Sequence, residues 1–301
     1  MRASRLLLVA PLVVLSGCLN LDFFVFRTRP AKPDEDVFKS STVPERLRTF
    51  YDDIPSSDGV KVTMTIARHD GAAGDVGDPA RNRIGILYCH GQSGWIDSTH
   101  PRADALWRLG YTVAVFDARG YGKTPGTPTE VTVAQDVDAA RAFFESQMGG
   151  ADNVGLYGRS LGTALCLTSA ANRGTKAIAL ESPIGALQSF VNDSLQVDAP
   201  SEWFFDSVMD NDANIQRYSG SLLVMHGTAD DFVQPKYGQR VFDLSDGHAS
   251  PRVFWSVEGA NHGNVPCNDF APKLNGNACD SGFSAGYLER VTALFDGALR
   301  Q

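Results

Sequence analysis

The sequence lacks several features that mark membrane-spanning and metal-binding proteins. Its N-terminal apolar run, Leu6 to Leu15, has ten residues, whereas a helix that spans a bilayer needs about 20. The five cysteines and six histidines contain no C-x-x-C and no His-x-x-x-His spacing, which disfavours a zinc site. No internal repeat is visible, which argues against a solenoid or a propeller. From these absences we expect no membrane-spanning helix and no metal site.

The first 20 residues, MRASRLLLVAPLVVLSGCLN, have the anatomy of a secretory signal peptide. Two arginines precede the apolar run, and the small residues Ser16 and Gly17 stand before Cys18. Residues 15–18 also resemble the lipobox of bacterial lipoproteins. This resemblance implies that residues 1–17 are removed and that Cys18 carries lipid, palmitate included. The protein would then be exported and lipid-anchored to a bacterial membrane. The alternative is a plain signal peptide that contains a cysteine.

Positive charge is scarce as well. The chain has 27 basic and 35 acidic residues, and removal of residues 1–17 takes away two arginines and no acids. Nucleic-acid binding calls for a basic face, and attraction to anionic lipids calls for a polybasic patch. We therefore expect no nucleic-acid partner, and membrane contact through the N-terminal lipid.

The other four cysteines fall into two pairs. Cys267 and Cys279 bracket a polar segment, and we expect a disulfide between them because the protein is expected to be exported. Cys89 and Cys166 lie inside apolar runs. For these two, buried free thiols are the simplest expectation.

Prolines and charges make residues 18–47 look like a membrane-proximal tether before a domain over 48–301. Within the tether, the patch at residues 23–26 either rests on a membrane or packs on the domain. Beyond it, segments typical of strands and helices alternate. Strands are predicted near 60–68, 83–91, 111–120, 153–158, 177–183, 220–227 and 252–259, and helices near 101–110, 132–150, 160–172 and 285–299. This alternation predicts an α/β fold: a mostly parallel central sheet with helices on both faces.

The segment NVGLYGRSLGTAL places Ser160 between Gly158 and Gly162, after a predicted strand and before a predicted helix. A strand, a sharp turn and a helix are the setting of a nucleophile elbow. The turn exposes the serine hydroxyl beyond the carboxyl end of the strand. A hydroxyl is a weak nucleophile, so it needs a base, and the base needs an orienting acid.

Two later loops supply these groups. Asp230 lies just beyond the strand LLVMHG, with Asp231 as a neighbouring alternative and Glu181 as a third candidate. His262 follows the last predicted strand in a loop of Gly and Asn, whereas the remaining histidines suit structural or solvated roles better. The order Ser160, Asp230, His262 is that of α/β-hydrolases.

An oxyanion hole needs two backbone N–H groups. Leu161, directly after the nucleophile, is one expected donor. Gln92, in the loop after LYCHG, is the other.

Taken together and in order, the segments LYCHGQSG, FDARGYGKTPGTPTE, GLYGRSLGTAL, ALESPIGAL, LLVMHGTADDFVQP and VEGANHGN resemble the α/β-hydrolase superfamily. More narrowly, they are similar to its Bem46/ABHD17-like branch of serine hydrolases, over about residues 50–300. The resemblance implies esterase, thioesterase, lysophospholipase or depalmitoylase activity without a cofactor. The segment between Cys267 and Cys279 departs from the cytosolic members, as does a lipid attached in the manner of a bacterial lipoprotein.

The stretch ARGYGKT looks in part like a phosphate-binding loop. A Walker A motif needs glycine where this chain has Asp117, so we expect a turn and no nucleotide site.

The sequence therefore predicts a serine hydrolase that acts on small-molecule or lipid esters or thioesters through an acyl-enzyme on Ser160. A small lid over about 184–220 is expected to contain Trp203, Phe204 and Phe205, which either line an acyl slot or anchor the lid. The alternatives are a peptidase of the same fold and a non-catalytic surface lipoprotein.

Overall fold

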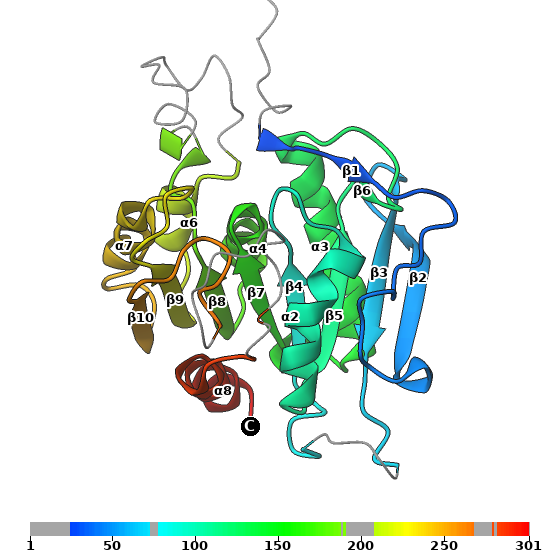
Figure 1. Cartoon of the computed structure of the whole chain (residues 1–301). Helices are drawn as coiled ribbons and strands as arrows, with labels where there is room; N and C mark the ends of the chain where they lie inside the picture. The colour runs from blue at the N-terminus through cyan, green and yellow to red at the C-terminus, as the bar shows by residue number, and fades with distance from the viewer. Residues whose placement is uncertain are drawn as a thin grey trace, which may run out of the picture.

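The computed structural model describes residues 25–72, 78–187, 189–190, 208–267, 279 and 282–300. Its main feature is an eight-stranded sheet in the order β10-β9-β8-β7-β4-β5-β3-β2 (Figure 1). Six neighbouring strands of this sheet are parallel, namely β10, β9, β8, β7, β4 and β5. Strand β3 runs antiparallel to β5, and β2 runs antiparallel to β3. The mostly parallel sheet predicted from the sequence is confirmed. The strands are β2 (Arg48–Pro55), β3 (Lys61–Ala67), β4 (Gly85–Cys89), β5 (Thr112–Asp117), β7 (Val154–Arg159), β8 (Ala177–Glu181), β9 (Ser221–Gly227) and β10 (Arg252–Val257).

Helices cover both faces of this sheet, as predicted (Figure 1). Along β4, Ile86 and Tyr88 face one core, while Leu87 and Cys89 face the other, because successive side chains of a strand point to opposite faces. Burial on both faces explains why the strands read as continuous apolar runs. Helices α2 (Ile96–Arg108) and α8 (Ala285–Leu299) pack on the first face; α3 (Glu130–Gln147), α4 (Leu161–Arg173), α6 (Asn211–Ile215) and α7 (Pro235–Leu244) pack on the second.

Strand β2 was not predicted. It pairs only with β3, at one edge of the sheet, and a register shift falls between Tyr51 and Ile54. Most of its residues are exposed or half-buried, so it carries no apolar run. An edge strand interrupted in this way shows little of the alternation that sequence patterns detect.

The segment expected to be a tether packs on the domain from residue 25 onward. Val25 and Phe26 are buried in the core, so these two residues of the 23–26 patch pack on the domain. Strand β1 (Arg29–Pro30) pairs with β6 (Tyr121–Gly122). Farther along, the backbone N–H of Thr42 donates to the Asp104 carboxylate on α2 at 2.5 Å. The boundary at residue 48 is therefore not a structural one, because the segment before it is held by apolar burial and hydrogen bonds.

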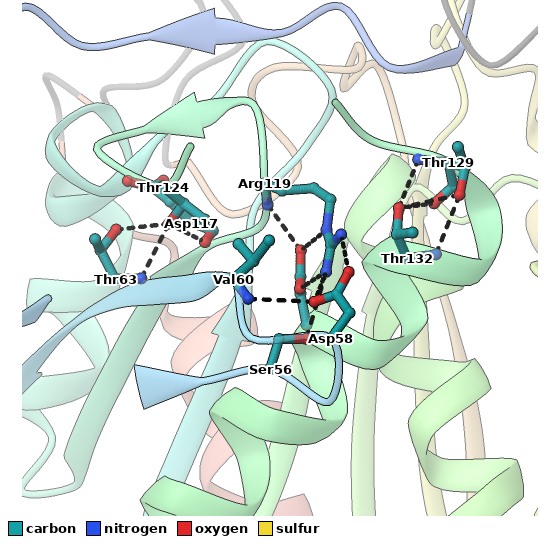
Figure 2. A network of polar contacts seen from close by, with 10 residues as sticks. Ser56, Asp58, Val60, Thr63, Asp117, Arg119, Thr124, Thr129 and Thr132 are labelled. Atoms are coloured by element: carbon teal, nitrogen blue, oxygen red, sulfur yellow. Dashed lines mark hydrogen bonds and ion pairs between the residues drawn. The ribbon is translucent and has the colours of Figure 1, made fainter. Parts of the chain in front are cut away.

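A buried polar network joins the end of β5 to its neighbours (Figure 2). The Arg119 guanidinium donates to both carboxylate oxygens of Asp136 on α3, at 2.7 and 2.9 Å, and to Asp58 in the β2–β3 turn. The Thr124 hydroxyl donates to the carbonyl of Asp117 at 2.7 Å and accepts the N–H of Thr63 at 2.9 Å. The ARGYGKT stretch thus forms a turn held by side-chain contacts, as expected.

Two disulfides are present. One joins Cys267 and Cys279, as expected. The other joins Cys89 and Cys166, so the expectation of two free thiols is wrong. The reason is tertiary: α4 packs directly on the end of β4, and a Cβ added to Gly162 would collide with the carbonyl of Cys89. This close approach brings together two cysteines that are 77 residues apart.

Some predictions fall outside the described residues. They concern Cys18, residues 1–24 and the lid aromatics Trp203, Phe204 and Phe205. Among the residues that are described, no helix has the length and apolarity needed to cross a membrane.

Candidate active site

Ser160 stands at the turn between β7 and α4. Its φ of 54° lies in the left-handed region, which non-glycine residues rarely adopt and which costs about 1–3 kcal/mol. The flanking glycines are required by close packing. A Cβ on Gly158 would lie 2.6 Å from the carbonyl oxygen of Gly162, and one on Gly162 would strike the carbonyl of Cys89. The G-x-S-x-G spacing therefore places Ser160 in a strained turn at the carboxyl end of a central strand.

The structure brings the three residues of the predicted triad together. The distance from His262 Nε2 to Ser160 Oγ is 3.0 Å, and from His262 Nδ1 to Asp230 Oδ2 it is 2.8 Å. Both distances lie within the range of hydrogen bonds. The three residues come from the loops that follow β7, β9 and β10. These loops lie close together because the carboxyl ends of parallel strands meet at one edge of a sheet.

Asp230 is nearly fully buried and is held on both oxygens. Its Oδ1 accepts the backbone N–H of Val233 at 2.8 Å and of Phe232 at 3.1 Å. Its Oδ2 lies 3.3 Å from His226 Nε2 in addition to its contact with His262. Burial raises the pKa of this carboxyl, but the hydrogen bonds from His226 and His262 outweigh it and hold the pKa well below the ordinary value. Asp230 is therefore ionised and fixed in orientation.

His226 was expected to be structural, and its contacts agree with that role beside the triad. Its Nε2 lies 2.8 Å from the carbonyl of Val233, in the same turn that binds Asp230. No sequence motif marks this contact, because a histidine followed by glycine at a strand end is not distinctive.

The two alternative acids are placed differently. Asp231 is exposed. Glu181 is fully buried, and its carboxylate accepts from Arg102 at 2.6 Å and from the Tyr157 hydroxyl at 2.6 Å. Of the three candidates, Asp230 alone has a hydrogen bond to the imidazole of His262.

The loop after β4 lies against the nucleophile. A Cβ added to Gly91 would come within 3.3 Å of the Ser160 Cβ, so Gln92 follows a residue in contact with Ser160. The Gln92 side chain donates to the carbonyl of Val25 at 2.5 Å. Leu161 is the first residue of α4, and the first N–H groups of a helix have no acceptor within it. Both predicted oxyanion donors are therefore beside Ser160, and their role remains a prediction.

His262, at the position predicted for the base, should gain a proton and become positively charged at low pH. Burial lowers the pKa of His262, the hydrogen bond to Asp230 raises it, and the positive charge of Arg159 lowers it, with a net decrease from 6.5. Only the neutral imidazole can accept a proton, so activity should be lost as pH falls through this pKa. We expect the acidic limb of a kcat/KM profile to have its midpoint below pH 6.5. A midpoint above pH 7 would contradict this assignment.

An aromatic side chain borders the triad. Phe232 has 54% of its surface exposed, and its ring centroid lies 5.0 Å from that of His262. The ring of Phe190 lies 6.3 Å from Phe232. An exposed phenylalanine next to the His262 imidazole offers an apolar contact to a bound group.

A cavity of about 890 Å³ lies elsewhere, lined by residues that include Ile84, Thr112 and Asn153. These residues stand at or just before the starts of β4, β5 and β7, which is the edge of the sheet opposite to the triad. Across the described part of the chain, no group of three or more His, Cys, Asp or Glu side chains could hold a metal ion.

Comparison with known proteins agrees with this architecture. A family model described as alpha/beta hydrolase fold matches residues 86–217. The chain has the alpha/beta hydrolase fold. The Pyrococcus furiosus esterase Pf2001 superposes on this hydrolase fold with a TM-score of 0.59 at 16% identity, over 79% of this chain and 89% of that one. A puromycin-hydrolyzing peptidase of Mycobacterium tuberculosis gives a TM-score of 0.62 at 16% identity, over 86% of this chain and 41% of that one.

Two curated relatives are similar in sequence. Alpha/beta hydrolase domain-containing protein 17B of Homo sapiens is 30% identical over 161 residues, which cover 52% of each chain. The uncharacterized protein Rv2307c of Mycobacterium tuberculosis is 30% identical over 181 residues, or 59% of this chain and 62% of that protein. The chain therefore matches between half and two thirds of the length of these relatives.

Proposed function

We propose that this chain hydrolyses carboxylic esters or thioesters through an acyl-enzyme on Ser160. The observation that carries the proposal is the relay from Ser160 Oγ to His262 Nε2 at 3.0 Å and from His262 Nδ1 to Asp230 at 2.8 Å. A serine, a histidine and an ionised carboxylate at these distances can activate a hydroxyl for acyl transfer. The esterase among the structural neighbours agrees with this choice of bond.

In the first step, Ser160 Oγ forms a bond to the substrate carbonyl carbon while His262 Nε2 takes the hydroxyl proton. The negative oxygen accepts hydrogen bonds from the N–H groups of Gln92 and Leu161. The carbonyl–oxygen or carbonyl–sulfur bond then breaks, and the alcohol or thiol leaves with the proton from His262. Asp230 stays ionised throughout and stabilises the imidazolium.

In the second step, water attacks the acyl-enzyme and gives a proton to His262. The bond from the acyl carbon to Ser160 Oγ breaks, the carboxylic acid leaves, and Ser160 regains its proton from His262. The exposed ring of Phe232 beside His262 favours substrates with an apolar group at this position.

The experiment is a substrate panel on the full-length protein in detergent, combined with labelling by a fluorophosphonate probe. We expect labelling at Ser160 and turnover of acyl esters or thioesters, with slower cleavage of matched peptide amides. Faster cleavage of the amides would make the protein a peptidase. Absence of both labelling and turnover would favour a non-catalytic surface lipoprotein.

The same proposal includes export and a lipid anchor on Cys18. It is supported by residues 15–18, which resemble a lipobox, and by the two disulfides, which are typical of oxidising compartments. Val25 follows Cys18 by seven residues, a span of at most about 25 Å. Since Val25 contacts Gln92, such an anchor would hold the site close to a membrane, which suits a lipid ester as substrate.

The anchor is tested by fractionation of a producing bacterium. We expect the natural chain in the membrane fraction with a metabolically incorporated palmitate analogue attached, and Cys18→Ser free of label. Equal labelling of both chains would exclude the lipid on Cys18 and leave the hydrolase assignment untouched.

A further inference from the structure

A mostly buried cluster of charged side chains lies beneath the loop that carries His262. We call it the arginine–glutamate cluster: Arg102, Arg159 and Glu181. Arg102 donates from Nη1 to Glu181 Oε1 at 2.6 Å and from Nη2 to the carbonyl of Gly263 at 2.5 Å. Arg159 donates from Nη2 to the carbonyl of His262 at 3.0 Å, and its Nε lies 3.4 Å from Glu181 Oε1. Both guanidinium groups therefore bind main-chain carbonyls of the histidine loop.

The same cluster contacts the main chain of the nucleophile. Arg159 is the last residue of β7 and directly precedes Ser160. In the parallel register it is paired with Glu181 at the end of β8. The backbone N–H of Ser160 donates to the carbonyl of Glu181 at 2.9 Å. Glu181 thus holds Ser160 through its main chain and the two arginines through its side chain.

Stability is a poor explanation for such a cluster. Glu181 is fully buried, and Arg102 has 3% of its surface exposed. Charged groups lose their hydration on burial, and well-packed apolar residues in their place are often equally stable or more stable. Each guanidinium, in contrast, gives directional hydrogen bonds that an apolar side chain cannot give. The contacts with His262 and Gly263 point to a role in the geometry of the site.

We propose that Arg159 and Arg102, joined by Glu181, are positioning residues that hold the histidine loop at the distance from Ser160 required for proton transfer. This inference rests on the proposed serine mechanism. It adds three residues outside the Ser160, His262 and Asp230 triad, and it explains why a buried glutamate ends the strand next to β7. A misplacement of about 1 Å in an active site can reduce turnover by about 100-fold.

The cluster also affects the charge of the base. The groups that face His262 are Asp230 from the loop after β9, Arg159 from β7 and Glu181 from β8, while Arg102 reaches its loop from α2 through Gly263. The positive charge of Arg159 lowers the pKa of His262, and the negative charge of Glu181 raises it. Removal of the Arg159 charge should therefore raise the pKa of His262, and removal of the Glu181 charge should lower it. An effect on folding alone would not produce two shifts of opposite sign.

The test compares Arg159→Met with Arg159→Lys in the full-length protein. For Arg159→Met we expect kcat to fall by about 10- to 100-fold, KM to change little, and the acidic limb of the pH profile to move to higher pH. Arg159→Lys keeps the charge but not the planar group. The acidic limb of its pH profile should stay at the wild-type pH, and its loss in kcat should be smaller than that of Arg159→Met. This variant remains informative if the methionine variant does not fold.

Two further variants complete the design. Glu181→Gln should move the acidic limb to lower pH. Arg141→Met is the matched control, because Arg141 is also buried and donates to Glu145 at 2.6 Å, but it contacts the far end of α4 at the carbonyl of Ser169. Arg141→Met should lower the stability of the protein without shifting the acidic limb of the pH profile.

The inference is overturned if folded Arg159→Met keeps the wild-type kcat and limb, or if the limb in Arg159→Lys moves as far as in Arg159→Met. Failure of the proposed function has a different signature, because the wild-type protein would then show neither labelling nor turnover.

Discussion

Substitution of Ser160 by alanine should abolish ester hydrolysis and fluorophosphonate labelling while leaving the fold intact. In the proposed mechanism the Ser160 hydroxyl oxygen bonds to the acyl carbon, so no acyl-enzyme can form without it. Loss of the nucleophile in comparable serine enzymes reduces kcat by roughly 10⁴- to 10⁶-fold. Alanine also occupies the same positive-φ backbone with one fewer atom, so the turn between β7 and α4 should persist. Initial rates on the best ester of the panel give the measurement.

The chain contains a matched control for this substitution. Ser182 is also buried, also has a positive φ, of 48°, and follows the end of the neighbouring strand β8. Ser182→Ala should keep most of the activity. If Ser160→Ala hydrolyses the ester at the wild-type rate, or Ser182→Ala is the inactive variant, the nucleophile is wrongly assigned.

Removal of the disulfide between Cys89 and Cys166 should cause a large loss of stability. The bond closes a loop with a sequence separation of 77, and the chain-entropy model gives about 4.5 kcal/mol for a loop of that length. The bond between Cys267 and Cys279 closes a separation of 12 and is worth about 3 kcal/mol in the same model. We therefore expect Cys89→Ala with Cys166→Ala to lower the free energy of unfolding more than Cys267→Ala with Cys279→Ala.

Urea unfolding of the three proteins, each with and without reductant, measures these differences. Reductant should destabilise the wild-type protein most, and it should destabilise each variant only by the contribution of the one bond that the variant keeps. Thiol labelling under denaturing, non-reducing conditions counts the free cysteines directly. Reaction at Cys89 or Cys166 in unreduced protein would contradict this disulfide.

The pairing of Cys89 with Cys166 depends on a tertiary contact that local sequence patterns do not encode. Both cysteines lie in apolar runs, and that pattern correctly indicates burial. It contains no information about which buried side chains meet, because helices α2 and α3 and strands β5, β6 and β7 lie between the two cysteines along the chain. The contact depends on how closely α4 approaches β4, and that approach depends on Gly162.

Glu181 illustrates the same limit for the active site. From its position after a strand it was a reasonable candidate for the acid, since loops at strand ends carry catalytic groups. What decides its role is the set of partners that the fold supplies. Arg102 reaches it from α2 and Arg159 from the adjacent strand, whereas the histidine loop brings the imidazole to Asp230.

The sequence by itself determined the mostly parallel sheet, the helices on its two faces, and the loops that carry Ser160, the candidate acids and His262. These are properties of local patterns: apolar runs, helical periodicity, and glycines that a sharp turn requires. Tertiary structure alone decided the pairing of Cys89 with Cys166, the packing of Val25 and Phe26 on the domain, and the cluster around Glu181. Each depends on side chains distant in sequence, and such contacts form only when the elements have packed.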